Sequence, residues 1–150
     1  MPKWKAQQVM MDLYRCDIDQ LNNLELLKAV VTTALSEGNI NCPDYMCTND
    51  ESSGNFTIVA ITTGAHLTLH SYPEQGFLAL DIFSCLPDSN PEKIALVIKG
   101  KLNPDSSKFT YIQRGTSSTD MKPRRKSQTK ALRRVKKAGA KVLQVFQKRK

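Results

Sequence analysis

Two periodicities of apolar residues divide the first 115 residues into strand and helix segments. Every second residue is apolar where the pattern predicts a strand, and apolar residues recur every three or four positions where it predicts a helix. The pattern predicts strands near residues 8–16, 56–61, 66–72, 77–85 and 108–113. It predicts helices over residues 21–35 and from residue 90 to about residue 99. The expected order of elements is therefore βαβββαβ.

Residues that favour helix ends and turns support these boundaries. Gly38 is a plausible stop for the first helix, and Asn90, Pro91 and Glu92 supply an N-cap, a first-turn proline and an early acid for the second. The turn formers at residues 73–76 join two strands into a hairpin. We therefore expect an α/β fold, a two-layer sandwich of a mainly antiparallel sheet with both helices on one face, because each helix must bury its apolar stripe.

The alternation also indicates which face of the sheet carries polar side chains. Leu67 and Leu69 point to one side of their strand, which we expect to lie under the helices. The opposite face then gathers His70, Tyr72, Asp81 and Cys85, and we consider it a candidate site. Each of these residues also has a structural interpretation: a hydrogen-bonded strand histidine, a locally paired aspartate, or a cysteine that behaves as a small buried hydrophobe.

Metal and disulfide chemistry is not indicated. His66 and His70 have the spacing of a zinc-binding helix, but in a strand they lie roughly 13 Å apart, which makes shared ligation improbable. The cysteines form no CxxC pair, so the sequence suggests neither a disulfide framework nor a structural zinc site. We expect these four thiols to be reduced: Cys16, Cys42, Cys47 and Cys85.

Charge is distributed unevenly along the 150 residues. Residues 1–115 hold 13 Asp and Glu against 9 Lys and Arg, a net charge of −4, whereas residues 116–150 carry 13 basic residues against Asp120, a net charge of +12. This asymmetry predicts an acidic domain over residues 1–115 followed by a basic linker and amphipathic helical tail over residues 116–150. No apolar stretch is long enough to cross a bilayer, and the first residues lack a signal-peptide core, so we expect a cytoplasmic protein.

The tail has several possible partners. Residues 116–119 are typical of a linker, and residues 129–148 can form a helix with apolar positions along one stripe and a dense basic face. We prefer RNA, DNA or a ribosomal surface as the partner, bound through residues 122–150. The alternatives are an anionic membrane, an acidic protein partner, or a disordered tail that only keeps the protein in solution. The candidate phosphate contacts are Arg124, Arg125, Lys126, Arg133, Arg134, Lys136 and Lys137.

The central strands resemble a known family. Residues 64–74, GAHLTLHSYPE, and residues 80–85, LDIFSC, are similar to the ESHLSIHTWPE and VDLFTCG signatures of the small bacterial and archaeal S-adenosylmethionine decarboxylases. The segments at residues 12–17 and 113–115 resemble the beginning and end of the same family, so the likeness covers roughly residues 5–115. It implies a two-layer α/β sandwich, in agreement with the order of elements above.

The resemblance also implies a chemistry and its loss. Family members cut themselves before an internal serine, which becomes a pyruvoyl cofactor, but Ala65 stands at that position and has no hydroxyl. We therefore expect an uncut chain without the cofactor. Matching the motif places His70 at the histidine that assists cleavage, Cys85 at the acid that reprotonates the product, and Thr57 at a hydroxyl used in processing. The expected substrate contacts are Tyr72 beside the adenine and Glu74 at the ribose.

Other departures accompany Ala65. The family's upstream His-x-Phe is replaced by Asn49 and Glu51, and the glycine after the catalytic cysteine is Leu86. Three functions stay open: an inactive binding or structural protein that docks through its tail, an inactive paralogue that pairs with and regulates an active decarboxylase, and a decarboxylase proenzyme in a Ser-to-Ala form. The resemblance implies a dimer, either a homodimer or a heterodimer with a paralogue. It leaves open whether S-adenosylmethionine still binds.

Overall fold

A single antiparallel sheet organises the domain. The computed structural model describes residues 5–42 and 44–115. Six strands line up in the order β2-β3-β4-β5-β1-β6. They are β1 (Ala6–Tyr14), β2 (Tyr45–Asp50), β3 (Asn55–Thr62), β4 (Ala65–Tyr72), β5 (Phe77–Ser84) and β6 (Ser106–Arg114).

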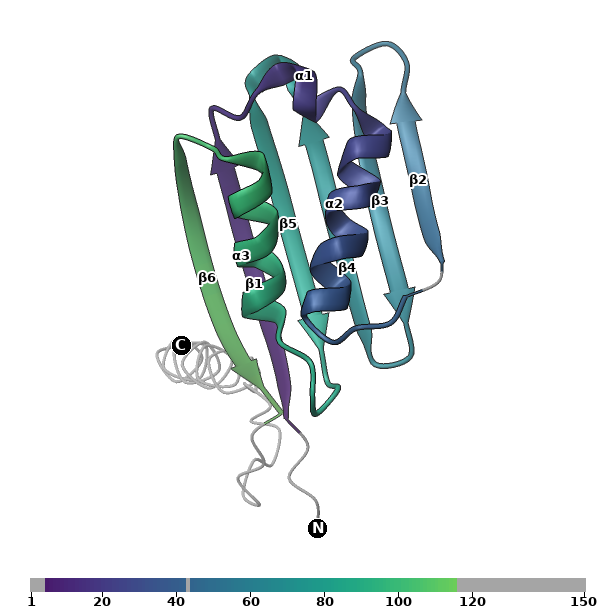
Figure 1. Ribbon diagram of the computed structural model, residues 1–150, viewed down its shortest axis with the longest axis vertical. Coiled ribbons are helices and arrows are strands. Elements are labelled where there is room, and N and C mark those ends of the chain that lie inside the picture. Colours follow the sequence, from purple (N-terminus) through teal and green to yellow (C-terminus); the bar gives the residue numbers. More distant parts are fainter. Residues whose placement is uncertain (1–4, 43, 116–150) are drawn as a thin grey trace, which may run out of the picture. The chain divides into compact units, whose positions relative to one another are not determined.

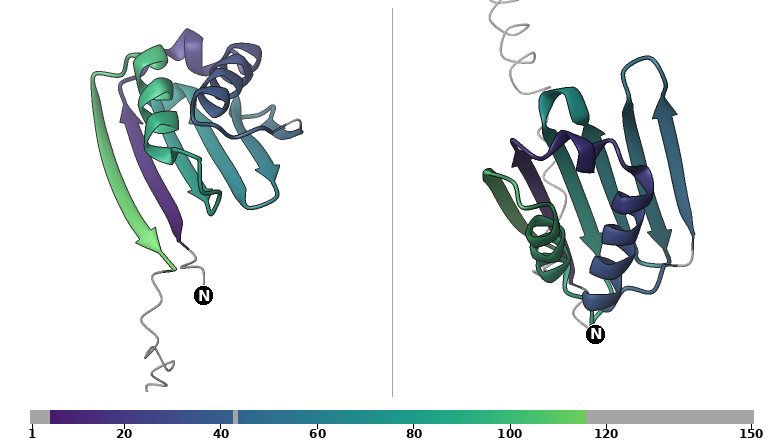
Figure 2. Two further views of the ribbon diagram at one scale, coloured as in Figure 1. Left: turned by 60° about the horizontal axis from the view of Figure 1, so that its bottom comes forward. Right: turned by 45° about the horizontal axis from the view of Figure 1, so that its top comes forward.

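The helices form the second layer. They are α1 (Ile18–Leu21), α2 (Leu24–Glu37) and α3 (Pro91–Leu102), and a 3₁₀ turn, η1 (Pro73–Gln75), joins β4 to β5. Figures 1 and 2 show α2 and α3 side by side across one face of the sheet, and no helix of the described residues covers the other face. The prediction of a two-layer sandwich with both long helices on one face is confirmed. We call the other side of the sheet the open face.

The hydrophobic core lies between the helices and the sheet. In β4 and β5 every second residue is buried, as the alternation predicted, and these buried residues pack against the inward stripes of α2 and α3. The core residues that these strands contribute include Leu67, Leu69, Leu78, Leu80 and Ile82. Burial of this apolar layer is the main force that holds the two layers together.

Local capping explains where the helices begin. The side chain of Asn90 accepts a hydrogen bond from Lys93 N at 2.9 Å, and Pro91 is the first residue of α3, as expected. The first helix, however, is divided in two. Asn23 accepts a hydrogen bond from Leu26 N at 2.9 Å and so caps a new helix, α2, whereas the short α1 is capped by Asp17.

One strand was not predicted. β2 is an edge strand with exposed residues on both of its sides, so it lacks the apolar alternation that predicts a strand. The predicted hairpin between β4 and β5 is confirmed, and its register places Tyr72 opposite Phe77. Gly76 closes this turn at φ 58°, a left-handed conformation that favours glycine. Its carbonyl accepts a hydrogen bond from Cys16 N at 2.9 Å, which ties the turn to the end of β1.

Within the described residues, no helix has the length and apolar character needed to cross a membrane. The predicted basic tail lies outside the described residues, so its domain boundary at residue 115 and its helix stay predictions. The same holds for its candidate phosphate contacts, which are Arg124, Arg125, Lys126, Arg133, Arg134, Lys136 and Lys137.

Candidate functional site

The first part of the site is the turn between β3 and β4. Gly64 adopts φ 87°, and its carbonyl oxygen accepts two hydrogen bonds from Cys85, one from the backbone N at 2.8 Å and one from Sγ at 3.1 Å. Two donors on one oxygen polarise the carbonyl and stabilise negative charge on it. Cys85 therefore lies directly against the peptide that joins Gly64 to Ala65.

Ala65 opens β4 on the helix side of the sheet. Its side chain is only 4% exposed, and it pairs across the strands with Ser84. The Ser84 hydroxyl is already engaged, because Ser84 Oγ lies 2.6 Å from Ser89 Oγ and accepts a hydrogen bond from Leu86 N at 3.1 Å. The Ser84 hydroxyl is thus part of a buried network that closes the loop after β5, and Thr62 of β3 pairs with Ala65 from the other side.

The second part of the site lies toward the other end of β4, on the open face. Thr57 of β3 and His70 of β4 are directly paired, and Thr57 Oγ1 lies 2.9 Å from His70 Nδ1. Tyr72, two residues further along β4, stacks on Phe77 with ring centroids 5.7 Å apart. Glu74 follows in η1 and is exposed. Four predicted site residues therefore come together at this end of the sheet.

A cavity of about 270 Å³ adjoins this second cluster. Its lining includes Thr57 and Tyr72 together with Asn55, whose side-chain oxygen is buried without a hydrogen-bond partner among the described residues. Asp50 lies at the same cavity, where hydrogen bonds from Ser52 and then Ser53 hold the pKa of its carboxyl below its usual value. The cavity thus offers hydrogen-bond acceptors beside an aromatic ring.

The two clusters are separate within one chain. Ala65 and His70 are five residues apart on β4, about 16 Å at roughly 3.3 Å per residue. His70 pairs with Ala79 of β5, six residues before Cys85, which corresponds to about 20 Å. Asp81 lies between them, opposite Thr68. His70, Tyr72 and Asp81 share the open face, as the alternation predicted, but they and Cys85 are spread along the strands rather than gathered in one cluster.

His66 lies near the first cluster and belongs to an aromatic stack. Its ring stacks on Phe83 with centroids 5.4 Å apart, and the Arg114 guanidinium lies 5.5 Å from the centre of the same Phe83 ring. Arg114 also donates a hydrogen bond to Gln8 Oε1 at 3.0 Å. Among residues 5–42 and 44–115, no group of three or more His, Cys, Asp and Glu is arranged to hold a metal ion.

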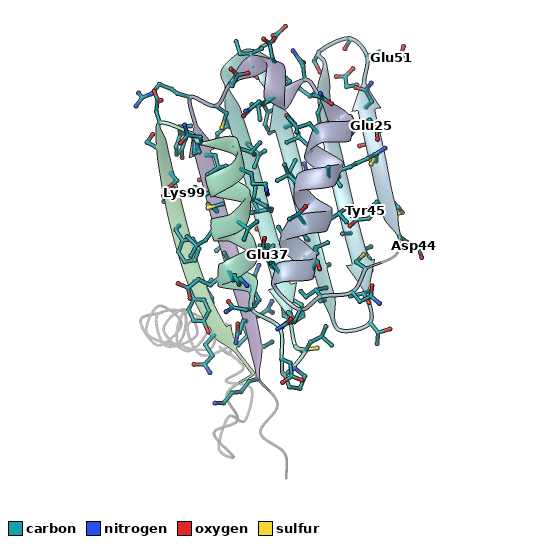
Figure 3. The ribbon with its side chains drawn as sticks, viewed as in Figure 1. Glu25, Glu37, Asp44, Tyr45, Glu51 and Lys99 are labelled. Carbon is teal, nitrogen blue, oxygen red and sulfur yellow. The ribbon has the colours of Figure 1, made fainter. Side chains whose placement is uncertain are left out.

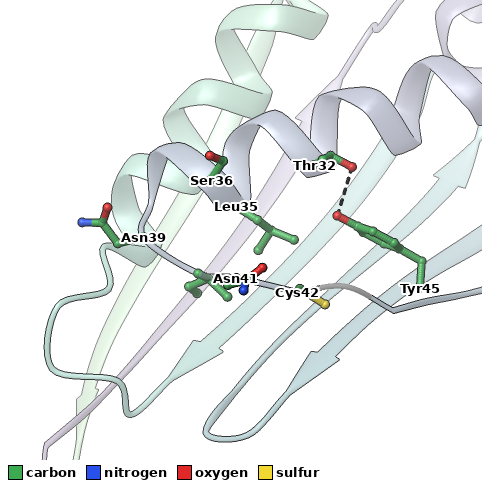
Figure 4. A pocket seen from close by; sticks show the side chains of 8 residues that line it. Thr32, Leu35, Ser36, Asn39, Asn41, Cys42 and Tyr45 are labelled. Atoms are coloured by element: carbon green, nitrogen blue, oxygen red, sulfur yellow. Dashed lines mark hydrogen bonds between the residues drawn. The ribbon is translucent and has the colours of Figure 1, made fainter.

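A larger cavity of about 530 Å³ lies elsewhere, beside α2 and the segment that leads into β2. Figure 3 shows Tyr45 at β2 beside α2, and Figure 4 shows its hydroxyl close to Thr32, 3.0 Å away. Thr32 Oγ1 donates its proton to Lys28 O, so Tyr45 is the donor in this pair. The cavity contains none of the predicted site residues, and its lining is uncharged, so we do not assign the chemistry to it despite its size.

The fold and the two clusters define a class of protein. It is a two-layer α/β domain with an open sheet face, a cysteine on a tight-turn carbonyl at one end and a threonine–histidine pair at the other. A family model described as S-adenosylmethionine decarboxylase matches residues 7–115. The chain belongs to the S-adenosylmethionine decarboxylase family.

Individual relatives agree with this assignment. The S-adenosylmethionine decarboxylase proenzyme of Sulfolobus acidocaldarius is 32% identical over 118 residues, which are 79% of this chain and 93% of the relative. The proenzyme of Shouchella clausii is 29% identical over 110 residues, 73% of this chain and 84% of the relative. The crystal structure of the adenosylmethionine decarboxylase from Aquifex aeolicus VF5 has the same fold, with a TM-score of 0.67 and 21% identity over 77% of this chain and 94% of the other.

The pyruvoyl group of this family does not fit the residues present here. It is made from a serine at the new amino terminus, which the motif likeness matches to Ala65, and Ala65 carries a methyl group that is buried against the core. The Gly64 carbonyl that precedes Ala65 accepts hydrogen bonds from Cys85 N and Sγ, but Ala65 has no side-chain oxygen that could attack it. We therefore derive no reaction step through this cofactor.

Proposed function

We propose that this chain is a noncatalytic member of its family, which stays uncleaved and pairs through its open face with a second domain of the same family. The observation that carries the proposal is Ala65. Self-cleavage begins when a side-chain oxygen attacks the preceding carbonyl carbon, and an alanine has no atom that can make this bond. Cys85 still polarises the Gly64 carbonyl, so the nucleophile is lost while its electrostatic support remains.

No neighbouring hydroxyl can replace the missing one. Ser84 of β5 and Thr62 of β3 are both paired with Ala65, and the Ser84 Oγ is held by Ser89 and by Leu86 N. A shift of the acyl group from N to O within one residue also requires the hydroxyl on the residue that donates the N. Ser84 and Thr62 lie on other strands, so attack by either hydroxyl would not leave a pyruvoyl group at the start of β4.

The separation of the two clusters supports pairing with a second domain. When two such sheets stack face to face with their β4 strands antiparallel, the His70 end of one copy lies over the Ala65 end of the other. Each complete site then takes Thr57 and His70 from one domain and Cys85 from its partner. A chain that lacks only the serine can thus supply Thr57 and His70 to a relative that retains it.

This pairing makes the proposed role concrete. The partner is a second copy of this chain or an active paralogue, and in the second case the mixed pair contains one competent site rather than two. The open face is suited to contact with another sheet, because apolar side chains such as Met46 and Ile61 are exposed on it. Tyr72 and Glu74 are the proposed substrate contacts on the His70 side.

The basic tail adds a second proposed contact, with the phosphates of RNA or DNA. Its net charge of +12 is carried by residues 116–150, whereas residues 1–115 carry −4. Phosphate binding through Lys and Arg is the interaction that such a charge distribution favours. The tail would then locate the domain on a polyanion and leave the sheet free for its protein partner.

The first experiment is an intact-mass measurement on the purified chain, combined with an assay for carbon dioxide release from S-adenosylmethionine. We expect a single species of about 16.8 kDa and no release. Two fragments that separate between Gly64 and Ala65 would overturn the proposal.

The second experiment replaces Ala65 with serine. We expect little self-cleavage from Ala65→Ser alone, because Asn49, Glu51 and Leu86 still differ from the family signature. Ala60→Ser is the matched control, since Ala60 is also a buried strand alanine on the helix side. Efficient cleavage and carbon dioxide release from Ala65→Ser would show instead a decarboxylase blocked at one residue.

The third experiment tests the pairing. Mixing this chain with an intact family paralogue should give a heterodimer in sedimentation equilibrium, with about half the number of competent sites per dimer. Thr68→Arg should abolish it, because Thr68 lies at the centre of the open face, opposite Asp81 and Val59. The arginine can pair with Asp81 in the isolated domain, so this variant should stay folded. A heterodimer that forms equally well with Thr68→Arg would contradict pairing through this face.

A further inference from the structure

The sheet has a second unoccupied surface, the outer edge of β6. This strand pairs with β1 over nine consecutive residues without a bulge, and its other edge has no partner strand among the described residues. Edge strands in monomeric proteins are usually short, bulged or interrupted by proline, because their free N–H and C=O groups otherwise pair with another chain. β6 has none of these three features, and its charged residues, Lys108 and Arg114, leave the uncharged residues 109–113 between them, so the backbone there is free to pair with a strand.

The side chains of β6 are unusually apolar for a solvent-facing edge. Phe109 is 39% exposed, Tyr111 45% and Ile112 41%. The two aromatic residues lie on the helix side, since they pair with Met11 and Val9, and Ile112 lies on the open face. Exposed apolar side chains on both sides of one edge favour burial against another strand rather than contact with water.

The sequence of β6 is complementary to itself in one register. If the second copy keeps its helices on the same side of the sheet, an odd-numbered residue must pair with an odd-numbered one and an even-numbered residue with an even-numbered one. The two-fold axis of an antiparallel pair then passes through a residue, and the central candidates are Phe109, Thr110 and Tyr111. Centring on Tyr111 places Lys108 opposite Arg114, two like charges that repel. Centring on Phe109 leaves the last two residues of β6 beyond the end of the partner strand.

Centring on Thr110 avoids both costs. All nine residues of β6 are then paired, Phe109 lies opposite Tyr111 twice, and Thr110 meets its own copy. Lys108 lies opposite Ile112 and Arg114 opposite Ser106, so no charges of the same sign meet. Aromatic pairs and threonine pairs across strands are the contacts that stabilise antiparallel sheets.

We propose that β6 pairs with β6 of a second copy of this chain, antiparallel and centred on Thr110, so that one continuous sheet spans both copies. The two-fold axis passes through Thr110 perpendicular to the sheet. Both sets of helices then lie on one side, and both open faces stay free on the other. Edge pairing is therefore independent of the proposed pairing through the open face, and the two together assemble four domains.

A cysteine at the two-fold axis tests the register. In full-length protein with Cys47→Ser, which removes the exposed native thiol, Thr110→Cys should form a disulfide-linked dimer under mild oxidation. Lys108→Cys is the control, because in this register residue 108 is about 13 Å from its own copy. We expect at least tenfold more cross-linked dimer from Thr110→Cys than from Lys108→Cys. Equal cross-linking, or more dimer from Tyr111→Cys, would overturn the proposal.

A charge test needs no cross-link and separates this proposal from the previous one. Ile112→Lys places two lysines opposite each other at both ends of the pair and should weaken association by about tenfold, whereas Ile112→Glu should preserve it. Both are measured by sedimentation equilibrium in the Thr68→Arg background, where the open face is blocked. Retained Thr110→Cys cross-linking in that background supports edge pairing even if open-face pairing fails. If the Thr68→Arg protein is a monomer whether residue 112 is Ile, Lys or Glu, edge pairing is wrong, and the proposed pairing through the open face is not affected.

Discussion

The turn at Gly64 can be tested by a single methyl group. Gly64 adopts φ 87°, and a Cβ built on it would lie 3.1 Å from Cys85 Sγ and 3.1 Å from Leu86 Cδ2. Gly64→Ala therefore introduces both a strained backbone and two close contacts. Gly100→Ala is the matched control, because Gly100 lies in α3 and a Cβ there would have no atom within 4 Å.

The two substitutions should have opposite effects on stability. A left-handed conformation costs an alanine about 1–2 kcal/mol relative to glycine, and relief of the two close contacts adds on the order of 1 kcal/mol. We expect Gly64→Ala to lose about 2–3 kcal/mol and about 10 °C or more in Tm. Because Gly100 is an exposed position of α3, Gly100→Ala should gain up to about 1 kcal/mol.

Differential scanning calorimetry of both variants gives the comparison, and a double variant separates the causes. Gly64→Ala with Leu86→Ala, compared with Leu86→Ala alone, removes the contact with Leu86 and leaves the backbone strain. Gly64→Asn should cost less than Gly64→Ala in backbone energy, since asparagine tolerates the left-handed region. If Gly64→Ala is as stable as Gly100→Ala, the turn does not have the conformation from which the Cys85 contacts were argued.

Three further predictions concern other residues. Burial and then the nearby Asp105 raise the pKa of the Cys16 thiol, so iodoacetamide should modify exposed Cys47 much faster than Cys16, and equal rates in a peptide-mapping experiment would contradict this. Hydrogen bonds lower the pKa of Asp50 from 3.8, so its carboxylate stabilises the fold above that pH and the effect disappears as the pH falls through the folded value. Asp50→Asn should therefore lower the urea midpoint at pH near 7 but not near 2, and an unchanged midpoint at neutral pH would refute the role. Truncation after Gly115 should abolish binding to RNA or duplex DNA, which in the full chain should weaken with salt at a log–log slope of roughly 0.7–0.9 per phosphate contacted; equal affinity of the two proteins would exclude the tail.

The alternation of apolar residues was sufficient to predict most of the fold. It placed the strands that have one face in the core, since each of them buries every second side chain. The two edge strands have no buried residue, but β6 was predicted because it carries Phe109, Tyr111 and Ile112. β2 was missed because its sequence, YMCTND, has no such apolar pattern, and its pairing with β3 makes it a strand. The break between α1 and α2 depends on Asn23, whose capping role competes with an apolar spacing that continues through it.

For the candidate site, the alternation of apolar residues predicted which face of the sheet each side chain lies on, but not how far apart the side chains lie along that face. Alternation assigns His70 and Asp81 to the same side without saying which residues lie opposite each other. The turn at residues 73–76 determines which residues of β4 and β5 lie opposite each other. Once Tyr72 pairs with Phe77, His70 must meet Ala79, and Cys85 must lie opposite Gly64. The cavity beside Asn55 could not be predicted, because β2, which forms one of its walls, was not recognised.

If the chain stays uncleaved, as proposed, the connection between β3 and β4 also affects how this protein can be handled. Residues 63 and 64 link the two strands as a tight hairpin, so their pairing is an intramolecular event with a small loop-closure entropy. A domain cut at this point would have to reassemble from two chains at a rate that depends on concentration. An uncleaved chain does not have to meet a second fragment. After complete denaturation it can therefore form the β3–β4 hairpin again at a rate that does not depend on protein concentration.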